Sequence, residues 1–342
     1  MNQMPKQEVE PIEPADPLFP QGSEGGNRIK AVAPWLGAIA ILAYLFWDVP
    51  YQDAWQAARN ARLDLFIPEM LAAVIFWFLL DSGALAYLLT RFNAPVSWAE
   101  ARSIRGITYI VTVLNWNVGT AAIVLHLRRS KQVPALESTS SLFFYGNCDA
   151  ALLMALTLIG TSTFSDSATL STIQKFAGAF FAFQIGIFLM LAANRPNWNW
   201  IRRIRNTAIV RSYRLSTPRD FLIVLGLKLI YFMGFLWIFW AGSHAFGIGI
   251  PFSLAVASAP AIMMISALPL SPAGLGTQAA AMVYFWSDYG DKASILAFGL
   301  VFPIALTLSR CLLGLLYLKD LRELRQTSPT GVAIGSGPAS PS

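Results

Sequence analysis

The stretch Ala267-Leu268-Pro269-Leu270-Ser271-Pro272-Ala273-Gly274-Leu275-Gly276-Thr277-Gln278 decides how this chain folds, because it sets two prolines and two glycines between strongly apolar runs. Proline lacks a backbone donor and clashes with the preceding helical turn, and glycine allows positive φ. A helix must therefore open between Ser271 and Gly276. Open backbone at membrane depth is tolerated only where protein or a wet cavity surrounds it. We predict a re-entrant hairpin over Ser253–Trp286 with its broken tip facing a cavity; a Pro-kinked pair of ordinary helices is the alternative.

The composition indicates a membrane protein. Of 342 residues, 55% are hydrophobic and only 13% are charged, and several apolar runs reach the roughly 20 residues that cross a bilayer. The net charge of +6 comes from short basic segments beside these runs, as in cytoplasmic loops, so we expect no nucleic-acid partner. The chain has two histidines and two cysteines, and both cysteines lie in apolar runs. We therefore expect no metal site and no cofactor.

The apolar runs predict an all-α polytopic membrane protein with six crossings. Residues 1–28 are acidic and poor in apolar side chains, and residues 321–342 are rich in Ser, Pro and Gly, so both are expected to be disordered tails around a membrane domain over 29–320. Tyr51–Asp64 mixes apolar and charged residues, which is typical of an interfacial helix. The predicted crossings are Ala31–Trp47, Leu65–Thr90, Val133–Gly160, Thr169–Ala193, Phe221–Ala245 and Ala293–Leu318.

The charge distribution predicts a second hairpin. The segment Ala99–Leu127 is interrupted at Asn115-Trp116-Asn117-Val118-Gly119. If this segment crossed once, the Arg-rich segment 195–219 would face the side opposite to the other basic loops, against the positive-inside rule. We therefore expect it to enter and return from the cytoplasm. Both termini are then cytoplasmic, and the membrane is expected to be a prokaryotic plasma membrane.

The order of elements suggests an internal repeat. Span, hairpin and span from about 65–160 have the same order as those from about 219–318, with the opposite direction of insertion. Two oppositely inserted re-entrant hairpins in an inverted repeat are typical of transporters that bind substrate near the bilayer midplane, between the halves.

Four charged residues lie inside predicted spans: Asp81, Asp149, Lys228 and Arg310. A charge at the centre of a membrane helix costs about 2.5–3.5 kcal/mol on insertion scales, so we expect these side chains to face one another, the hairpin tips or water. Lys228 and Arg310 are candidate partners for an anionic headgroup, with the two aspartates as counter-charges or proton carriers. Structural ion pairs between spans are the alternative.

The two breaks supply further candidate residues. Their polar side chains are able to cap freed backbone or to bind a ligand, and their glycines leave room for a close approach. The predicted substrate cavity, which contains no catalytic residue, consists of Asn115, Asn117, Asp149, Lys228, Ser271, Gly274, Gly276, Gln278 and Arg310.

The run from Leu268 to Thr277, followed by Ser309-Arg310, resembles the transmembrane, flippase-like family of lysylphosphatidylglycerol synthase. The resemblance covers roughly Ile29–Leu318, and Asp149 lies where that family often has an aspartate. No soluble aminoacyl-transfer domain is expected after Leu318. The resemblance therefore implies the membrane module alone, without the synthase reaction.

These patterns favour a translocator, rather than an enzyme, that moves a lipid or lipid-linked substrate with an anionic headgroup through a midplane cavity. Membrane lipids are the expected partners. Two alternatives stay open: a membrane-embedded transferase of a lipid headgroup or sugar, with Asp149 or Asp81 as base, and a non-catalytic partner of a lipid-processing enzyme. A transferase would usually show carboxylates or histidines clustered at one interface, whereas this sequence scatters single charges among the spans.

Overall fold

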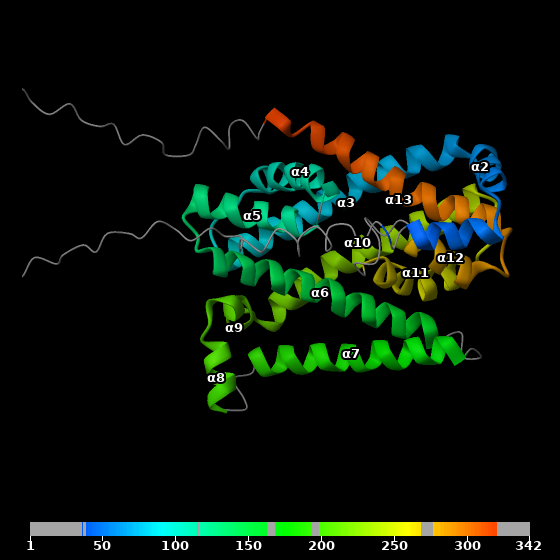
Figure 1. Ribbon diagram of the computed structural model, residues 1–342. Coiled ribbons are helices and arrows are strands. Elements are labelled where there is room, and N and C mark those ends of the chain that lie inside the picture. Colours follow the sequence, from blue (N-terminus) through cyan, green and yellow to red (C-terminus); the bar gives the residue numbers. More distant parts are fainter. Residues whose placement is uncertain are drawn as a thin grey trace, which may run out of the picture.

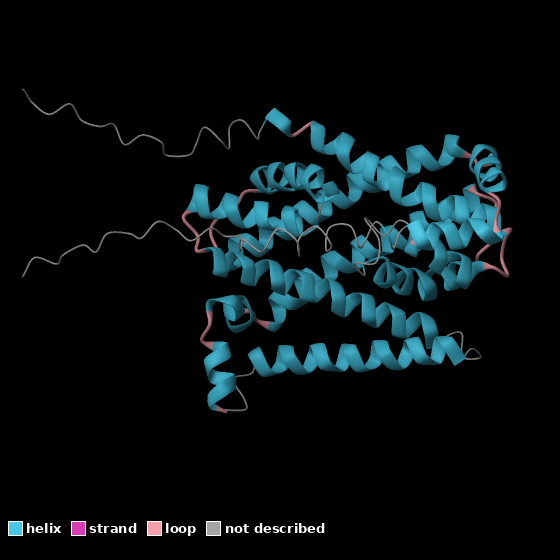
Figure 2. Ribbon diagram, viewed as in Figure 1, coloured by secondary structure: helices cyan, strands magenta, loops and turns pink. Residues whose placement is uncertain are grey.

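A computed structural model describes residues 36, 39–114, 116–162, 168–192, 198–267 and 276–319. All regular secondary structure in these ranges is helical (Figure 2). Five helices are long and apolar enough to cross a membrane, and they match five of the six predicted crossings. They are α3 (Leu63–Phe92), α6 (Ala135–Ser162), α7 (Ala168–Ala192), α10 (Pro218–Ala245) and α13 (Lys292–Leu315). The first predicted crossing is described only as the short apolar helix Ile39–Asp48, and both predicted tails lie outside the described residues.

The remaining helices are shorter and gather at the two ends of the bundle. Figure 1 shows α4 and α5 toward one end and α11 and α12 toward the other. The α4 helix ends at Leu114 and α5 begins at Trp116, so residues 116–119 of the first predicted break are helical, and residue 115 lies outside the described residues. The α11 helix ends at Ala267 and α12 begins at Thr277, and residues 268–275 of the second predicted break lie outside the described residues. The bounds are α2 (Tyr51–Asn60), α4 (Trp98–Leu114), α5 (Trp116–Lys131), α8 (Asn199–Arg205), η1 (Ala208–Val210), α9 (Arg211–Leu215), α11 (Phe252–Ala267) and α12 (Thr277–Trp286).

Glycines allow each short helix pair to cross a long helix closely. A Cβ placed on Gly160 of α6 would lie 2.2 Å from the Cα of Ala257 in α11. A Cβ on Gly314 of α13 would lie 2.9 Å from the carbonyl oxygen of Gly106 in α4. Small residues at such crossings let two backbones approach, which is how helices gain van der Waals contact in a membrane. Consequently α11 packs on α6, and α4 packs on α13.

The central pair α3 and α10 is joined at both ends. Asp220, in the first turn of α10, accepts hydrogen bonds from the Tyr87 hydroxyl at 2.6 Å and from Arg91 Nε at 2.9 Å, both on α3. The same carboxylate completes a capping box with Thr217, which fixes the start of α10. At the other end, the backbone N–H of Arg62 donates to the carbonyl of Ala245 at 2.9 Å. The two helices are therefore held as one unit.

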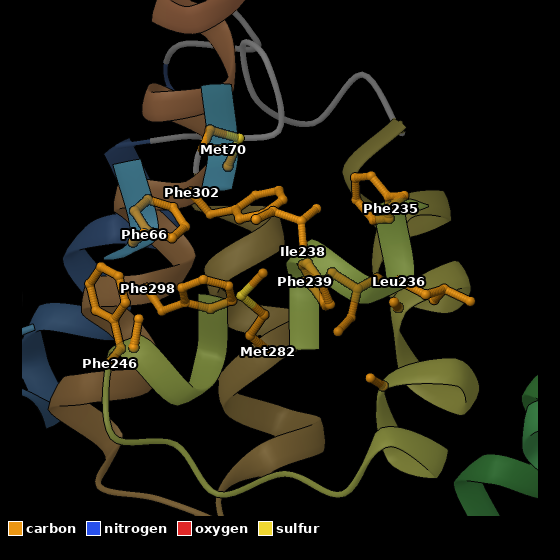
Figure 3. Packing of buried hydrophobic residues seen from close by; sticks show 14 of the residues in the cluster. Phe66, Met70, Phe235, Leu236, Ile238, Phe239, Phe246, Met282, Phe298 and Phe302 are labelled. Atoms are coloured by element: carbon orange, nitrogen blue, oxygen red, sulfur yellow. The ribbon is translucent and has the colours of Figure 1, made fainter. Parts of the chain in front are cut away.

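An aromatic core holds α13 against this central pair. Phe66 of α3, Phe239 of α10 and Phe298 of α13 are fully buried, and Figure 3 shows Phe66, Phe298 and Phe302 gathered beside Met282. The rings of Phe239 and Phe302 meet edge to face, with centroids 5.3 Å apart. Because the surrounding lipid is as apolar as these side chains, the gain comes mainly from close packing.

The arginine-rich segment closes one end of the bundle, which we call the Arg-rich end and which carries α8 and α9 (Figure 1). Two of its arginines satisfy carbonyls in the last turns of long helices: Arg205 Nε donates to Met190 of α7 at 3.0 Å, and Arg211 Nη1 donates to Phe92 of α3 at 2.6 Å. Such carbonyls have no partner inside their own helix. Part of the positive charge therefore has a structural use, while Arg202 and Arg203 stay exposed.

Candidate functional site

Five helices bring their charged residues together in the interior of the bundle. The group, which we call the charge cluster, comprises Asp81 on α3, Arg105 and Tyr109 on α4, Tyr145 and Asp149 on α6, Lys228 and Tyr231 on α10, and Arg310 on α13. The expectation that the intramembrane charges face one another is thus met for Asp81, Asp149 and Lys228, which form direct ion pairs.

Asp81 lies at the centre of the charge cluster. Its Oδ2 is 2.8 Å from Arg105 Nε, and its Oδ1 is 3.5 Å from Lys228 Nζ and accepts the hydroxyl hydrogen of Tyr145. The Arg105 contact is an ion pair without an aligned hydrogen bond. The side chains of Asp81 and Arg105 are 12% and 7% exposed. At this depth an ionised carboxylate needs such partners, because its loss of hydration costs several kcal/mol.

Lys228 bridges the two aspartates. Its Nζ is 2.9 Å from each carboxylate oxygen of Asp149 and lies 3.6 Å above the ring centroid of Tyr145. The Lys228 side chain is 6% exposed, whereas that of Asp149 is 27% exposed. Of the two aspartates, Asp149 is therefore the one that a polar ligand or water reaches more easily.

Arg310 differs from the other two cations of the charge cluster. Its Nη2 donates to the Tyr231 hydroxyl at 3.4 Å, and its guanidinium lies 5.5 Å from the ring centroid of Tyr109. Within the described residues it forms no ion pair, and its buried Nε has no hydrogen-bond partner. The cluster holds three cations, Arg105, Lys228 and Arg310, against two carboxylates. It therefore has one positive charge in excess, and Arg310 is the cation without a carboxylate partner.

The sequence interpretation missed Arg105 and the tyrosines. It named only Asp81, Asp149, Lys228 and Arg310 as charges within the membrane. Arg105, however, is seven residues beyond Trp98, about 10 Å along the helix, and is 6% exposed. The tyrosines carried a detectable signal, since each lies one helical turn from a charged residue of the cluster. The pairs are Arg105 and Tyr109, Tyr145 and Asp149, and Lys228 and Tyr231.

The predicted tip residues are only partly described. Gly276 has φ of +87°, as expected for a glycine at a break, and it precedes α12. A Cβ on Gly276 would meet Ile41 at 3.3 Å and Leu42 at 3.5 Å, so the N-terminal helix covers this position. Gln278 is buried on the first turn of α12. Neither residue forms a hydrogen bond or ion pair with the charge cluster in the described part of the chain. Asn115, Ser271, Gly274 and the side chain of Asn117 lie outside it.

Within the described residues, five helices long and apolar enough to cross a membrane enclose paired charges. This combination defines an integral membrane protein. The particular family follows from comparison: the model of the lysylphosphatidylglycerol synthase TM region matches residues 31–314. The chain belongs to this family, which confirms the resemblance seen at the second break. A search of curated proteins finds no match.

Proposed function

We propose that this protein is a lipid translocator, and that the charge cluster receives the anionic headgroup of its substrate. The observation that carries the proposal is the excess positive charge at Arg310. A partly buried guanidinium whose Nε is buried without a partner, and which has no carboxylate beside it, is costly. A phosphate supplies both the missing charge and several hydrogen-bond acceptors. Binding of an anion would therefore stabilise a site that is otherwise incompletely neutralised.

The neighbouring groups fit a phosphate in chemical type. Tyr231 and Tyr109 offer hydroxyl donors beside Arg310, and Lys228 offers an ammonium that now bonds Asp149. An incoming phosphate would compete with Asp149 for Lys228, and the partial exposure of Asp149 would allow that carboxylate to turn toward water. The cations would thus change partners while the site stays nearly neutral at each step, which keeps the cost of an intramembrane charge low.

We also propose the inverted repeat with its two re-entrant hairpins, which the packing pattern supports. Under the pairing of α3 with α10, α4 with α11, α5 with α12 and α6 with α13, the contact of α4 with α13 corresponds to that of α11 with α6. Because α3 and α10 exchange places under this pairing, the contact between them corresponds to itself. Such reciprocity is what a two-fold relation in the membrane plane would produce. With α3 and α10 joined at both ends, alternating access would come from movement of the short helix pairs.

The alternative function, a membrane-embedded transferase of a lipid headgroup or sugar, has less support than the translocator. Asp81 and Asp149, its candidate bases, are both engaged in ion pairs with cations, so each would have to leave its partner before it could act on a substrate. The third reading, a non-catalytic partner of a lipid-processing enzyme, predicts that the purified chain changes no lipid distribution by itself. A transport assay on the isolated protein therefore separates it from the leading proposal.

The test is lipid accessibility in proteoliposomes that contain the purified full-length chain and phosphatidic acid with a fluorescent acyl chain. Dithionite added outside bleaches the outer leaflet, so translocation appears as bleaching beyond one half. We expect Arg310→Gln to reduce the initial rate about ten-fold or more, since loss of one charged hydrogen-bonding partner is worth about 1.5–3 kcal/mol. Arg219→Gln, which removes an exposed arginine at the start of α10, is the matched control. Wild-type rates in Arg310→Gln, with slow bleaching in protein-free vesicles, would overturn the proposal.

A further inference from the structure

A second polar site lies at the end of the bundle opposite the Arg-rich end, where α2, the end of α10 and the start of α13 surround a cavity of about 640 Å³. This volume is within the range typical of small-ligand sites, about 300–1,000 Å³. The lining residues are Asp53, Gln56, Ala57, Asn60, Ala61, Arg62, His244, Ala245, Phe246, Gly247, Asp291, Ala293 and Ser294. None of them belongs to the charge cluster.

One face of α2 supplies much of the polar lining. Asp53, Gln56 and Asn60 are three and four residues apart, so they lie along the same side of the helix. These three side chains and that of Arg62 form no hydrogen bond or ion pair within the described residues, although all four line the cavity. They are therefore available to a ligand.

The opposite wall adds further polar groups. His244 Nδ1 lies 2.9 Å from the carbonyl oxygen of Trp240. Since a carbonyl only accepts, Nδ1 carries the hydrogen of this bond, and Nε2 has no hydrogen-bond partner within the described residues. Asp291 uses Oδ2 to cap α13 through the backbone N–H groups of Ala293 and Ser294, which leaves Oδ1 free.

The formal charge and the hydrogen-bonding groups of the lining indicate the class of ligand. Two carboxylates and one guanidinium line the cavity, so their formal charges sum to −1. The lining contains both acceptors and donors, together with alanines and Phe246. Hydroxyl groups suit such a lining, because each hydroxyl donates to a carboxylate or imidazole and accepts from an amide or guanidinium. A bare phosphate does not, because its charge would meet a net negative site.

The position of the cavity indicates that the hydroxyls belong to a lipid. Trp47, Tyr51 and Trp55, on and beside α2, are exposed aromatic residues. Exposed tryptophan and tyrosine at the end of a membrane bundle mark the level of the lipid headgroups. We infer that this cavity binds the hydroxyl-rich headgroup, a polyol or a sugar, of a lipid in the leaflet opposite the Arg-rich end. The inference deepens the proposed function, since a translocated lipid needs a place for its headgroup at that end.

The test measures lipid preference rather than transport. Native mass spectrometry of the detergent-solubilised full-length protein would follow competition among dioctanoyl forms of phosphatidylinositol, monoglucosyl diacylglycerol and phosphatidic acid. We expect the first two to be retained in preference to phosphatidic acid, and their ratio shows whether the source is a phospholipid or a glycolipid. Asp53→Ala/Asn60→Ala should reduce this preference about thirty-fold, as two lost hydrogen bonds of about 1 kcal/mol each imply. Asp53→Asn, which keeps the side-chain shape, should lose part of it.

The control is Gln52→Ala/Arg59→Gln, which changes α2 at positions that do not line the cavity. Wild-type protein without a preference for the hydroxyl-rich lipids, or an equal loss in the control, would overturn the inference. This outcome is distinct from failure of the translocator proposal. If phosphatidic acid moves in an Arg310-dependent way without any headgroup preference, only the cavity inference fails. If the preference is present but no lipid moves, only the transport proposal fails.

Discussion

The two short helix pairs pack in the same manner but differ in chemistry. The pair α4 and α5 crosses α13 through glycine contacts, and it carries Arg105 into the charge cluster. The pair α11 and α12 crosses α6 through Gly160 and Ala257, and residues 252–286 contain no charged residue. The first pair is therefore tied to the bundle by an ion pair as well as by packing. The second has no charged residue with which to form such a pair, so close packing has a larger part in holding it, and the N-terminal helix covers Gly276.

This difference predicts that substitutions in the two helix pairs differ in how much stability they remove. Separation of an ion pair in the membrane interior is costly, because each charge must then find another partner. Van der Waals contacts of small residues tolerate sliding more easily, since no single atom is left without compensation. We expect changes at the charge cluster to cost more than changes at the second pair, and the predictions below are ordered accordingly.

The largest effect is expected from Lys228→Met, which deletes the cation that bridges Asp81 and Asp149. Breaking a buried ion pair by removing one partner typically costs about 3–5 kcal/mol, because a charge is left buried without compensation. The protein should show a much lower thermal midpoint in detergent. Lys175→Met, at an exposed position on α7, is the control and should change little.

A double variant sharpens this test. Lys228→Met/Asp149→Asn removes the charge that Lys228 leaves behind, so it should regain part of the lost stability, while Asp81 keeps Arg105. If the double variant is no more stable than Lys228→Met, the two side chains do not act as a pair. The cluster would then not be the feature that distinguishes the two regions.

The packing of α11 on α6 should be sensitive to added side-chain volume rather than to a change in charge. In Gly160→Val the Cβ would lie 2.2 Å from the Cα of Ala257, which is backbone and cannot rotate away. Overpacking of this kind costs about 1–3 kcal/mol, and more when backbone must shift. We expect early unfolding in a thermal melt. Gly178→Val, where a Cβ would be 3.6 Å from Leu158, is the control on α7, and a matching loss there would argue against a specific crossing.

The sequence predicted five of the described spans and the glycine at the start of α12 because both depend on local properties. Apolar length sets a crossing, and glycine permits positive φ wherever the segment lies. It also predicted that the spans' charges would meet, since isolated charges are costly at that depth. Arg105 was missed because charge counting alone cannot distinguish an arginine at the interface from one a few turns deeper on a short helix. The cavity beside α2 was missed because residues from 53 to 294 come together only in the fold.

The smallest loss of stability is expected for a substitution of Gly276. Two contributions to this loss, backbone strain and a steric contact, can be measured separately. The φ of +87° at Gly276 is unfavourable for a residue with a Cβ, by about 1–2 kcal/mol. An added Cβ would also lie 3.3 Å from Ile41, a flexible side chain that needs to move only a few tenths of an ångström. Gly276→Ala should therefore lower stability modestly, and Ile41→Ala in the same chain should not restore it, because backbone strain remains. Full recovery in the double variant would mean that contact with the N-terminal helix, rather than the conformation of the break, makes glycine necessary at this position.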